Sequence, residues 1–166
     1  MIPSDHFVMF YNEIFKYLVR QGDAVLQEYY RTISEHQATH CLKLFQEKRI
    51  PGIVEYYEMI RREENCDMDI INENNEVYKT VMHNCPSLRK VLESDGGACP
   101  VYCDHCPGWL MPLLTRCNLY YVKDVIAYDM PRCQTGIFES PDKARKFREL
   151  VLKRHPGHPE LVISNF

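Results

Sequence analysis

The spacing of apolar residues changes once along this chain, and that change constrains its fold more than any other feature. Between residues 6 and 62, apolar residues recur three or four positions apart, which is typical of helices that bury one face. Between residues 76 and 82, apolar and polar residues alternate, as they do in a half-buried strand. Helices first and strands afterwards indicate an α+β fold with an antiparallel sheet.

Three helices are expected in the N-terminal region. A break at residues 21–23 ends the first, residues 24–48 form the second, and residues 53–62 form a short third. Residues 61–75 are highly charged and are expected to connect the helices to the sheet, with room for a fourth short helix. Helical turns are further expected at residues 87–93 and 108–115.

Residues 119–129 and 133–140 resemble the two strands of a hairpin whose turn spans residues 129–132. A final helix over residues 141–154 and an extended tail follow. A chain of 166 residues suits one domain. We therefore expect a single domain over residues 1–166, in which the N-terminal helices (residues 1–62) and the C-terminal helix pack on a small antiparallel sheet within the cysteine-containing region (residues 76–140).

The chain contains eight cysteines. Its first residues lack the basic and apolar segments of a signal peptide, and no apolar run is long enough to span a membrane. A cytoplasmic location is therefore expected, where cysteines stay reduced and serve as metal ligands or catalysts more often than as disulfides. The net charge of −3, without a Lys/Arg-rich run, gives no reason to expect a nucleic-acid partner.

Three of the cysteines form the motif Cys99-x3-Cys103-x2-Cys106. This spacing matches the cluster-binding motif of radical-SAM enzymes, but too few residues follow Cys106 to build the barrel of those enzymes. Two interpretations stay open. The three thiolates could hold an iron–sulfur cluster together with Cys85 or Cys117, or they could hold zinc with Cys117 or His105 as the fourth ligand.

His36 and His40 form a second candidate pair, because residues four apart share one face of a helix and can bind one metal ion. Leu44 and Ile33 share that face, and no third ligand converges with the pair in the sequence. These neighbours favour a structural role, and a second metal site there is an open question.

The third candidate is distributed along the chain. Asn84-Cys85-Pro86 follows the strand that contains His83, Cys103 lies in a later loop, and Asp129 precedes Cys133 at the hairpin turn. With these positions, and with Phe138 after Cys133, residues 77–139 resemble the L-2-amino-thiazoline-4-carboxylate hydrolase-like family. The chain carries Cys99, Cys106 and Cys117 in addition to that pattern.

The resemblance implies a hydrolase that opens a small sulfur-containing or amino-acid-like substrate at a C–N bond. Cys85 would be the nucleophile, and His83, two residues away, would lower its pKa and transfer protons. Asp129 would orient a histidine or a water molecule. Alternatively, Cys85, Cys103 and Cys133 would hold a metal ion whose bound water attacks the substrate.

Two other classes of function stay open. One is a non-enzymatic zinc or iron–sulfur module that acts as a sensor or assembly partner, and the other is a ligand-binding domain without turnover. The hydrolase hypothesis requires a small-molecule substrate, whereas the module requires closed metal coordination. The full set of candidate metal ligands is Cys85, Cys99, Cys103, Cys106 and Cys133.

Overall fold

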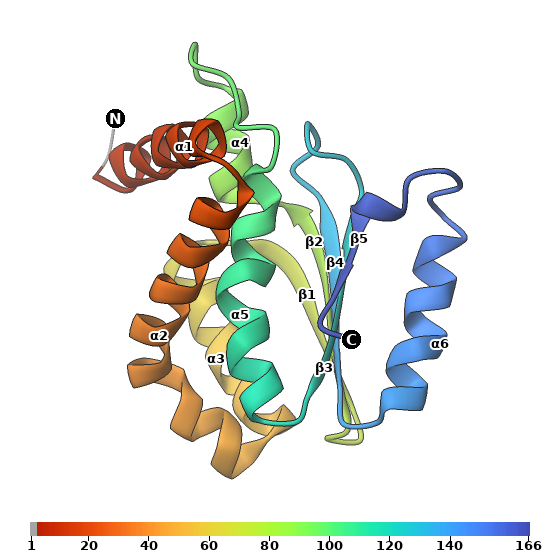
Figure 1. The fold of residues 1–166 in the computed structure, drawn as a ribbon. Helices are drawn as coiled ribbons and strands as arrows, with labels where there is room; N and C mark the ends of the chain where they lie inside the picture. Colours follow the sequence, from red (N-terminus) through yellow and green to blue (C-terminus); the bar gives the residue numbers. More distant parts are fainter. Residues whose placement is uncertain (1–2) are drawn as a thin grey trace.

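The computed structural model describes residues 3–166, which form an α+β fold and confirm the predicted fold class (Figure 1). The elements follow in the order α1 (Pro3–Gln21), α2 (Asp23–Lys48), α3 (Ile50–Glu63), β1 (Asp67–Glu73), β2 (Val77–Asn84), α4 (Pro86–Leu92), the 3-10 turn η1 (Tyr102–Asp104), α5 (His105–Arg116), β3 (Tyr120–Val125), β4 (Cys133–Phe138), α6 (Pro141–Leu152), the 3-10 turn η2 (Pro159–Leu161) and β5 (Val162–Ser164).

The strands form one five-stranded sheet with the order β1-β2-β4-β3-β5, in which all neighbours are antiparallel. Helices α2, α3 and α5 cover one face of this sheet, and α6 covers the other (Figure 1). Helix α1 crosses the end of α2 and packs against α4. The sheet is therefore the central layer of three.

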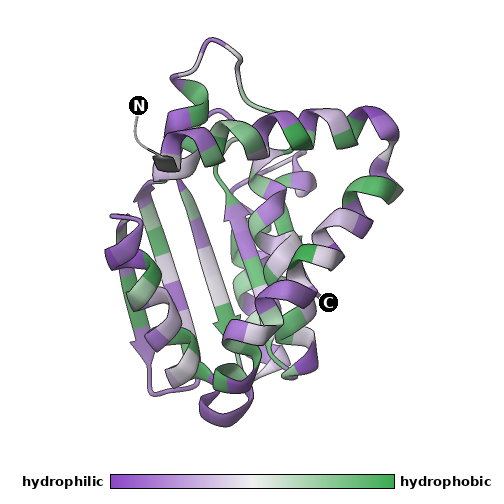
Figure 2. Cartoon of the chain, turned by 90° about the vertical axis from the view of Figure 1, so that its left-hand side faces the viewer, coloured by the Kyte–Doolittle hydropathy of each residue, from purple (hydrophilic) through white to green (hydrophobic). Residues whose placement is uncertain are grey.

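The alternation of side chains along the strands creates two separate cores, one on each face of the sheet. Tyr78, Tyr121 and Ile137 are buried under α2, α3 and α5. Their strand neighbours Val77, Val122 and Phe138 are buried against α6 instead. The helices carry both hydrophilic and hydrophobic residues along their length, as expected of elements that bury one side only (Figure 2).

The predicted helices are confirmed, since α1, α2, α3, α4 and α6 lie at or close to the expected ranges. The break after α1 is at Gly22, whose φ of 112° suits glycine, and the break after α2 is at Arg49, whose φ is 57°. Helix α5 begins at His105, earlier than predicted, and therefore contains Cys106.

The prediction for residues 61–75 is wrong, because β1 occupies Asp67–Glu73 and pairs along its whole length with β2. Asn74 and Asn75 form the turn between the two strands with φ values of 54° and 60°, which is the left-handed geometry of a tight hairpin. Only Met68 is buried in this edge strand, so its sequence shows no clear alternation. The tail also contributes a strand, β5, which pairs with β3.

Close contact between α5 and α2 depends on Gly108. A Cβ atom added at this residue would lie 2.5 Å from Cδ2 of Tyr30, whose side chain is buried. We expect Gly108→Ala to lower the free energy of unfolding by about 1–2 kcal/mol, because overpacking outweighs the gain in helix propensity. Urea denaturation measures this change.

Gly96→Ala is the matched control, since its added Cβ would meet no atom closer than 3.6 Å. We expect the control to change the free energy of unfolding by less than about 0.5 kcal/mol. Equal effects of the two substitutions would contradict the close packing of α5 on α2.

Candidate functional site

The end of β2 lies beside the connection between β3 and β4, where Arg132 Nε donates to the carbonyl oxygen of His83 at 3.3 Å. Among residues 3–166, however, no hydrogen bond or ion pair joins the side chains of the predicted catalytic residues His83, Cys85 and Asp129. His83 is exposed near the end of β2, and its Nε2 lies 2.9 Å from Oδ2 of Asp69. Cys85 lies beyond the end of β2, where its backbone N–H donates to the carbonyl oxygen of Pro131 at 2.7 Å. Asp129 is exposed in the connection between β3 and β4. Because β2 ends at Asn84, strand alternation does not place His83 and Cys85 on one face.

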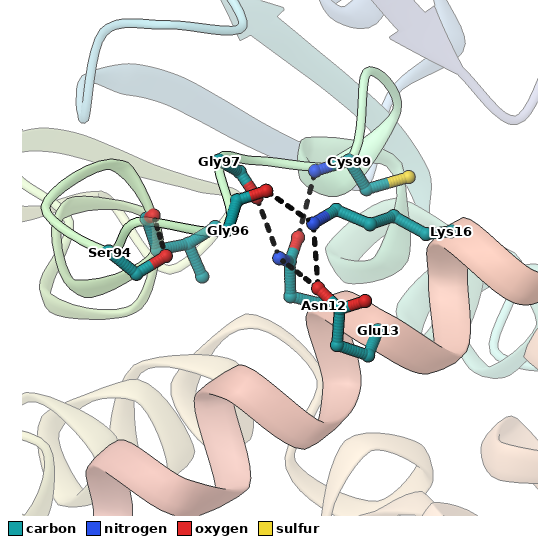
Figure 3. A network of polar contacts seen from close by, with 8 residues as sticks. Asn12, Glu13, Lys16, Ser94, Gly96, Gly97 and Cys99 are labelled. Carbon is teal, nitrogen blue, oxygen red and sulfur yellow. Dashed lines mark hydrogen bonds and ion pairs between the residues drawn. The ribbon is translucent and has the colours of Figure 1, made fainter.

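Cys99 is anchored to α1 by a network around Asn12 (Figure 3). Asn12 is 1% exposed. Its Oδ1 accepts a hydrogen bond from the backbone N–H of Cys99 at 2.8 Å, and its Nδ2 donates to the carbonyl oxygen of Gly97 at 2.8 Å. Lys16 Nζ donates to the carbonyl oxygen of Gly96 at 2.7 Å. These contacts hold the loop of residues 96–99 against α1. Because this loop leads into η1 and α5, Asn12 helps to position the start of α5.

Cys106 is the second residue of α5, so its thiol lies where the N-terminal amides of the helix favour negative charge. Its side chain is exposed, and His105 Nε2 lies 3.3 Å from its Sγ. The other ring nitrogen of His105, Nδ1, contacts the carbonyl oxygen of Tyr102. A carbonyl can only accept, so Nδ1 carries a hydrogen atom and Nε2 faces the sulfur. The result is a thiol–imidazole pair with a third group that orients the imidazole.

Aromatic rings hold the imidazole of His105 in this position. Its centroid lies 5.4 Å from that of Phe15 in a stacked arrangement, 4.9 Å from that of Tyr102 and 4.8 Å from that of Trp109. Phe15 and Tyr102 are buried, so they limit the rotation of the ring. The packing of α1 against η1 therefore preorganises the thiol–imidazole pair.

A buried lysine faces the same site from the sheet. Lys123 lies on β3 and is 4% exposed, and its Nζ donates to the carbonyl oxygen of Cys103 at 3.1 Å. Thr135 of β4 lies opposite Lys123, and Thr80 of β2 lies opposite Thr135. These three buried residues form a polar row across the middle of the sheet, on the face that α3 and α5 cover.

Charges around Cys106 favour its thiolate form. Desolvation by the surrounding protein raises the pKa of Cys106, but the charges of His105 and Lys123 and the hydrogen bond with His105 outweigh desolvation and lower the pKa to about 6. Burial lowers the pKa of Lys123, but the negative charge of Cys106 outweighs burial and raises this pKa well above its ordinary value. Lys123 and Cys106 therefore stabilise each other's charged forms.

The other thiols near Cys106 stay protonated at neutral pH. Burial raises the pKa of Cys103 to about 12 and that of Cys133 to about 11, although Lys123 lowers both. Burial is the main cause that raises the pKa of Cys85, and the negative charge of Cys106 raises it further. Cys106 is thus the thiol best suited to be a nucleophile in this cluster.

The predicted metal site gains no support from the geometry. Within residues 3–166, no three His, Cys, Asp or Glu side chains converge in a way that could hold a metal ion. His36 and His40 are both exposed on α2. Bound zinc or an iron–sulfur cluster at Cys85, Cys99, Cys103, Cys106 and Cys133 remains a prediction from the sequence alone.

A hollow of about 400 Å³ lies beside the start of α5 but does not include Cys106. Asp104, which accepts a hydrogen bond from the hydroxyl of Tyr128 at 2.8 Å, lies in its wall. The full lining is Gln27, Tyr30, Pro100, Val101, Asp104, Pro107, Gly108, Met111, Tyr128, Glu160 and Ile163. We do not assign the reaction to this hollow because Cys106 does not line it.

The roles of His105, as partner of the thiol, and of Lys123 were not predicted from the amino-acid sequence. The sequence does contain a sign that Lys123 is unusual. Alternation along β3 places it on the same face as Tyr121 and Val125, so a lysine interrupts an otherwise apolar strand face. Adjacent residues such as His105 and Cys106 seldom contact each other in a helix. Their contact here arises in the first turn of α5 and has no equivalent signal.

Comparisons with protein-family models, with curated proteins and with solved structures find no match for this chain. Among the residues that the structure describes, no helix is both long and apolar enough to cross a membrane.

Proposed function

We propose that this protein is a cysteine hydrolase that cleaves a C–N bond of a small sulfur-containing or amino-acid-like molecule, with Cys106 as its nucleophile. The observation that carries the proposal is the position of the Cys106 thiol at the start of α5, 3.3 Å from His105 Nε2. His105 is the proton-transfer group, and Lys123 stabilises negative charge on the sulfur and on the attacked group.

The reaction follows from these groups without a further reagent. The Cys106 thiolate attacks the carbon of the C–N bond and forms a C–S bond. His105 donates a proton to the nitrogen as the C–N bond breaks, which leaves the acyl group on sulfur. Water, deprotonated by His105, then attacks the same carbon, breaks the C–S bond and regenerates the thiolate.

The resemblance to the L-2-amino-thiazoline-4-carboxylate hydrolase-like family supports the substrate class. In the proposal Cys106 replaces Cys85 as the nucleophile, because His105 and Lys123 favour the thiolate of Cys106 whereas burial raises the pKa of Cys85. His83 pairs with Asp69 and receives no role in the reaction.

The test uses the reduced, full-length chain with L-2-amino-thiazoline-4-carboxylate and a panel of open-chain amides and carbamoyl amino acids. We expect at least one of them to gain one molecule of water in a reaction that iodoacetamide treatment of the protein abolishes. Chromatography with mass detection measures the product. If no member of the panel is hydrolysed while Cys106 remains rapidly alkylated, the thiol is reactive but the hydrolase proposal fails.

A further inference from the structure

Cys103 and Cys106 share one side of a continuous helical segment. Cys103 lies in η1, and α5 begins at His105, the residue directly after the end of η1. Asp104 and His105 both have helical backbone angles, so no kink separates the two cysteines. Side chains three residues apart eclipse each other in a 3-10 turn and are neighbours in an α-helix. The two sulfur atoms can therefore meet with only a local adjustment of the first turn.

The other nearby thiols are held on different elements. Cys133 lies in β4, where it pairs with Val125 and Met82 of the neighbouring strands. Cys85 is fixed by its hydrogen bond to the carbonyl oxygen of Pro131. A disulfide from Cys106 to either residue would join α5 to a separate element, whereas a disulfide to Cys103 stays within one turn.

We propose that Cys103 and Cys106 form a reversible disulfide, which makes this turn a site of oxidative modification by peroxides. The inference requires the reactive Cys106 thiol of the proposed function, but it does not require turnover. Cys106 is exposed, whereas Cys103 is half-buried beside it, as expected of an attacking and a resolving cysteine.

The oxidation is balanced in two steps. The Cys106 thiolate attacks one oxygen of a peroxide, the O–O bond breaks, and the sulfur becomes a sulfenic acid while an alcohol or water leaves. The Cys103 thiol then attacks this sulfur, the S–O bond breaks, and water leaves as the disulfide forms. Two thiols of an external reductant reverse the oxidation by exchange.

Lys123 favours Cys106 both as the thiolate that attacks the peroxide and as the thiolate that leaves when the disulfide is opened. Its Nζ donates to the carbonyl oxygen of Cys103, and its charge stabilises a thiolate at Cys106. When a reductant opens the disulfide, Cys106 is therefore the sulfur that leaves as a stable thiolate. Oxidation would block the nucleophile, and reduction would restore it.

The experiment treats the reduced full-length protein with one equivalent of hydrogen peroxide, blocks free thiols with iodoacetamide, and digests with trypsin. Cys99, Cys103 and Cys106 fall in one tryptic peptide, residues 91–116. We expect this peptide to lose two hydrogen atoms and to regain them after dithiothreitol treatment. Fragment ions should locate the bond between Cys103 and Cys106, and a Cys99→Ser variant should retain it.

Variants separate the two steps. In Cys103→Ser, we expect dimedone to trap a sulfenic acid at Cys106 in place of the disulfide, and in Cys106→Ser we expect neither product. A disulfide from Cys106 to Cys85 or Cys133, or no disulfide at all in the wild-type chain, would overturn the inference. Hydrolysis without the disulfide would refute only this inference, and the disulfide without hydrolysis would refute only the proposed function.

Discussion

Replacement of Cys106 with serine is expected to reduce hydrolysis of any substrate found for this protein by about a thousand-fold or more, because a serine hydroxyl remains protonated where the thiol ionises. The Cys106 side chain is exposed and serine is nearly isosteric, so the thermal midpoint should stay close to that of the wild-type chain. Initial rates measure the first effect, and calorimetry or circular dichroism measures the second.

Cys85→Ser is the matched comparison, since Cys85 is the nucleophile that the family resemblance implies. We expect this variant to retain at least about half of the wild-type rate, because burial raises the pKa of Cys85 and its thiol has no part in the proposed reaction. The opposite pattern, with activity lost in Cys85→Ser and kept in Cys106→Ser, would refute Cys106 as the nucleophile. It would support Cys85, the nucleophile that the family resemblance implies.

Lys123→Met is expected to slow alkylation of Cys106 by iodoacetamide about tenfold at pH 7, because the substitution removes a positive charge that lowers the pKa of the thiol. Thiolate is the reacting form. In the wild-type chain the rate should therefore be nearly constant above neutral pH and fall as the pH drops through about 6. In the variant, desolvation still raises the pKa and one opposing charge is missing, so the midpoint should move to higher pH.

Stability distinguishes this electrostatic role of Lys123 from a structural one. Lys123 is buried and methionine has a similar shape, so the variant should be at least as stable as the wild-type chain. Lys153→Met, at an exposed position after α6, should change neither the alkylation rate nor its pH midpoint. An unchanged pH midpoint in Lys123→Met would show that Lys123 does not activate the thiol.

Periodicity predicted most of the fold because most elements bury one well-defined face. Helix α1 buries Phe15, α2 buries Leu26, Tyr30 and Phe45, and the spacing of such residues is visible in the sequence. Strand β1 gives no such signal, because it is an edge strand in which Met68 alone is buried. β1 forms because Asn74 and Asn75 make a turn that lets it pair with β2. This pairing with a neighbouring strand leaves no apolar pattern in the sequence of β1 itself.

The candidate site could be predicted only partially. The cluster of thiols was visible as sequence spacing, and the structure places Cys85, Cys103 and Cys133 close enough for the charge of Cys106 to affect their pKa values. The choice of nucleophile was not visible, because it depends on where α5 begins and on which side chain of β3 lies beneath it. Those are tertiary relations between Cys106, His105 and Lys123.

The most direct test of the central claim identifies the first thiol to react. The reduced wild-type chain is treated at pH 7 with less than one equivalent of iodoacetamide, and the alkylated positions are mapped by peptide mass spectrometry. The eight cysteines compete for the reagent in one molecule, so folding differences between variants play no role. We predict that nearly all of the label is on Cys106, and label mainly on Cys85 or spread over the exposed and half-buried cysteines would contradict the account.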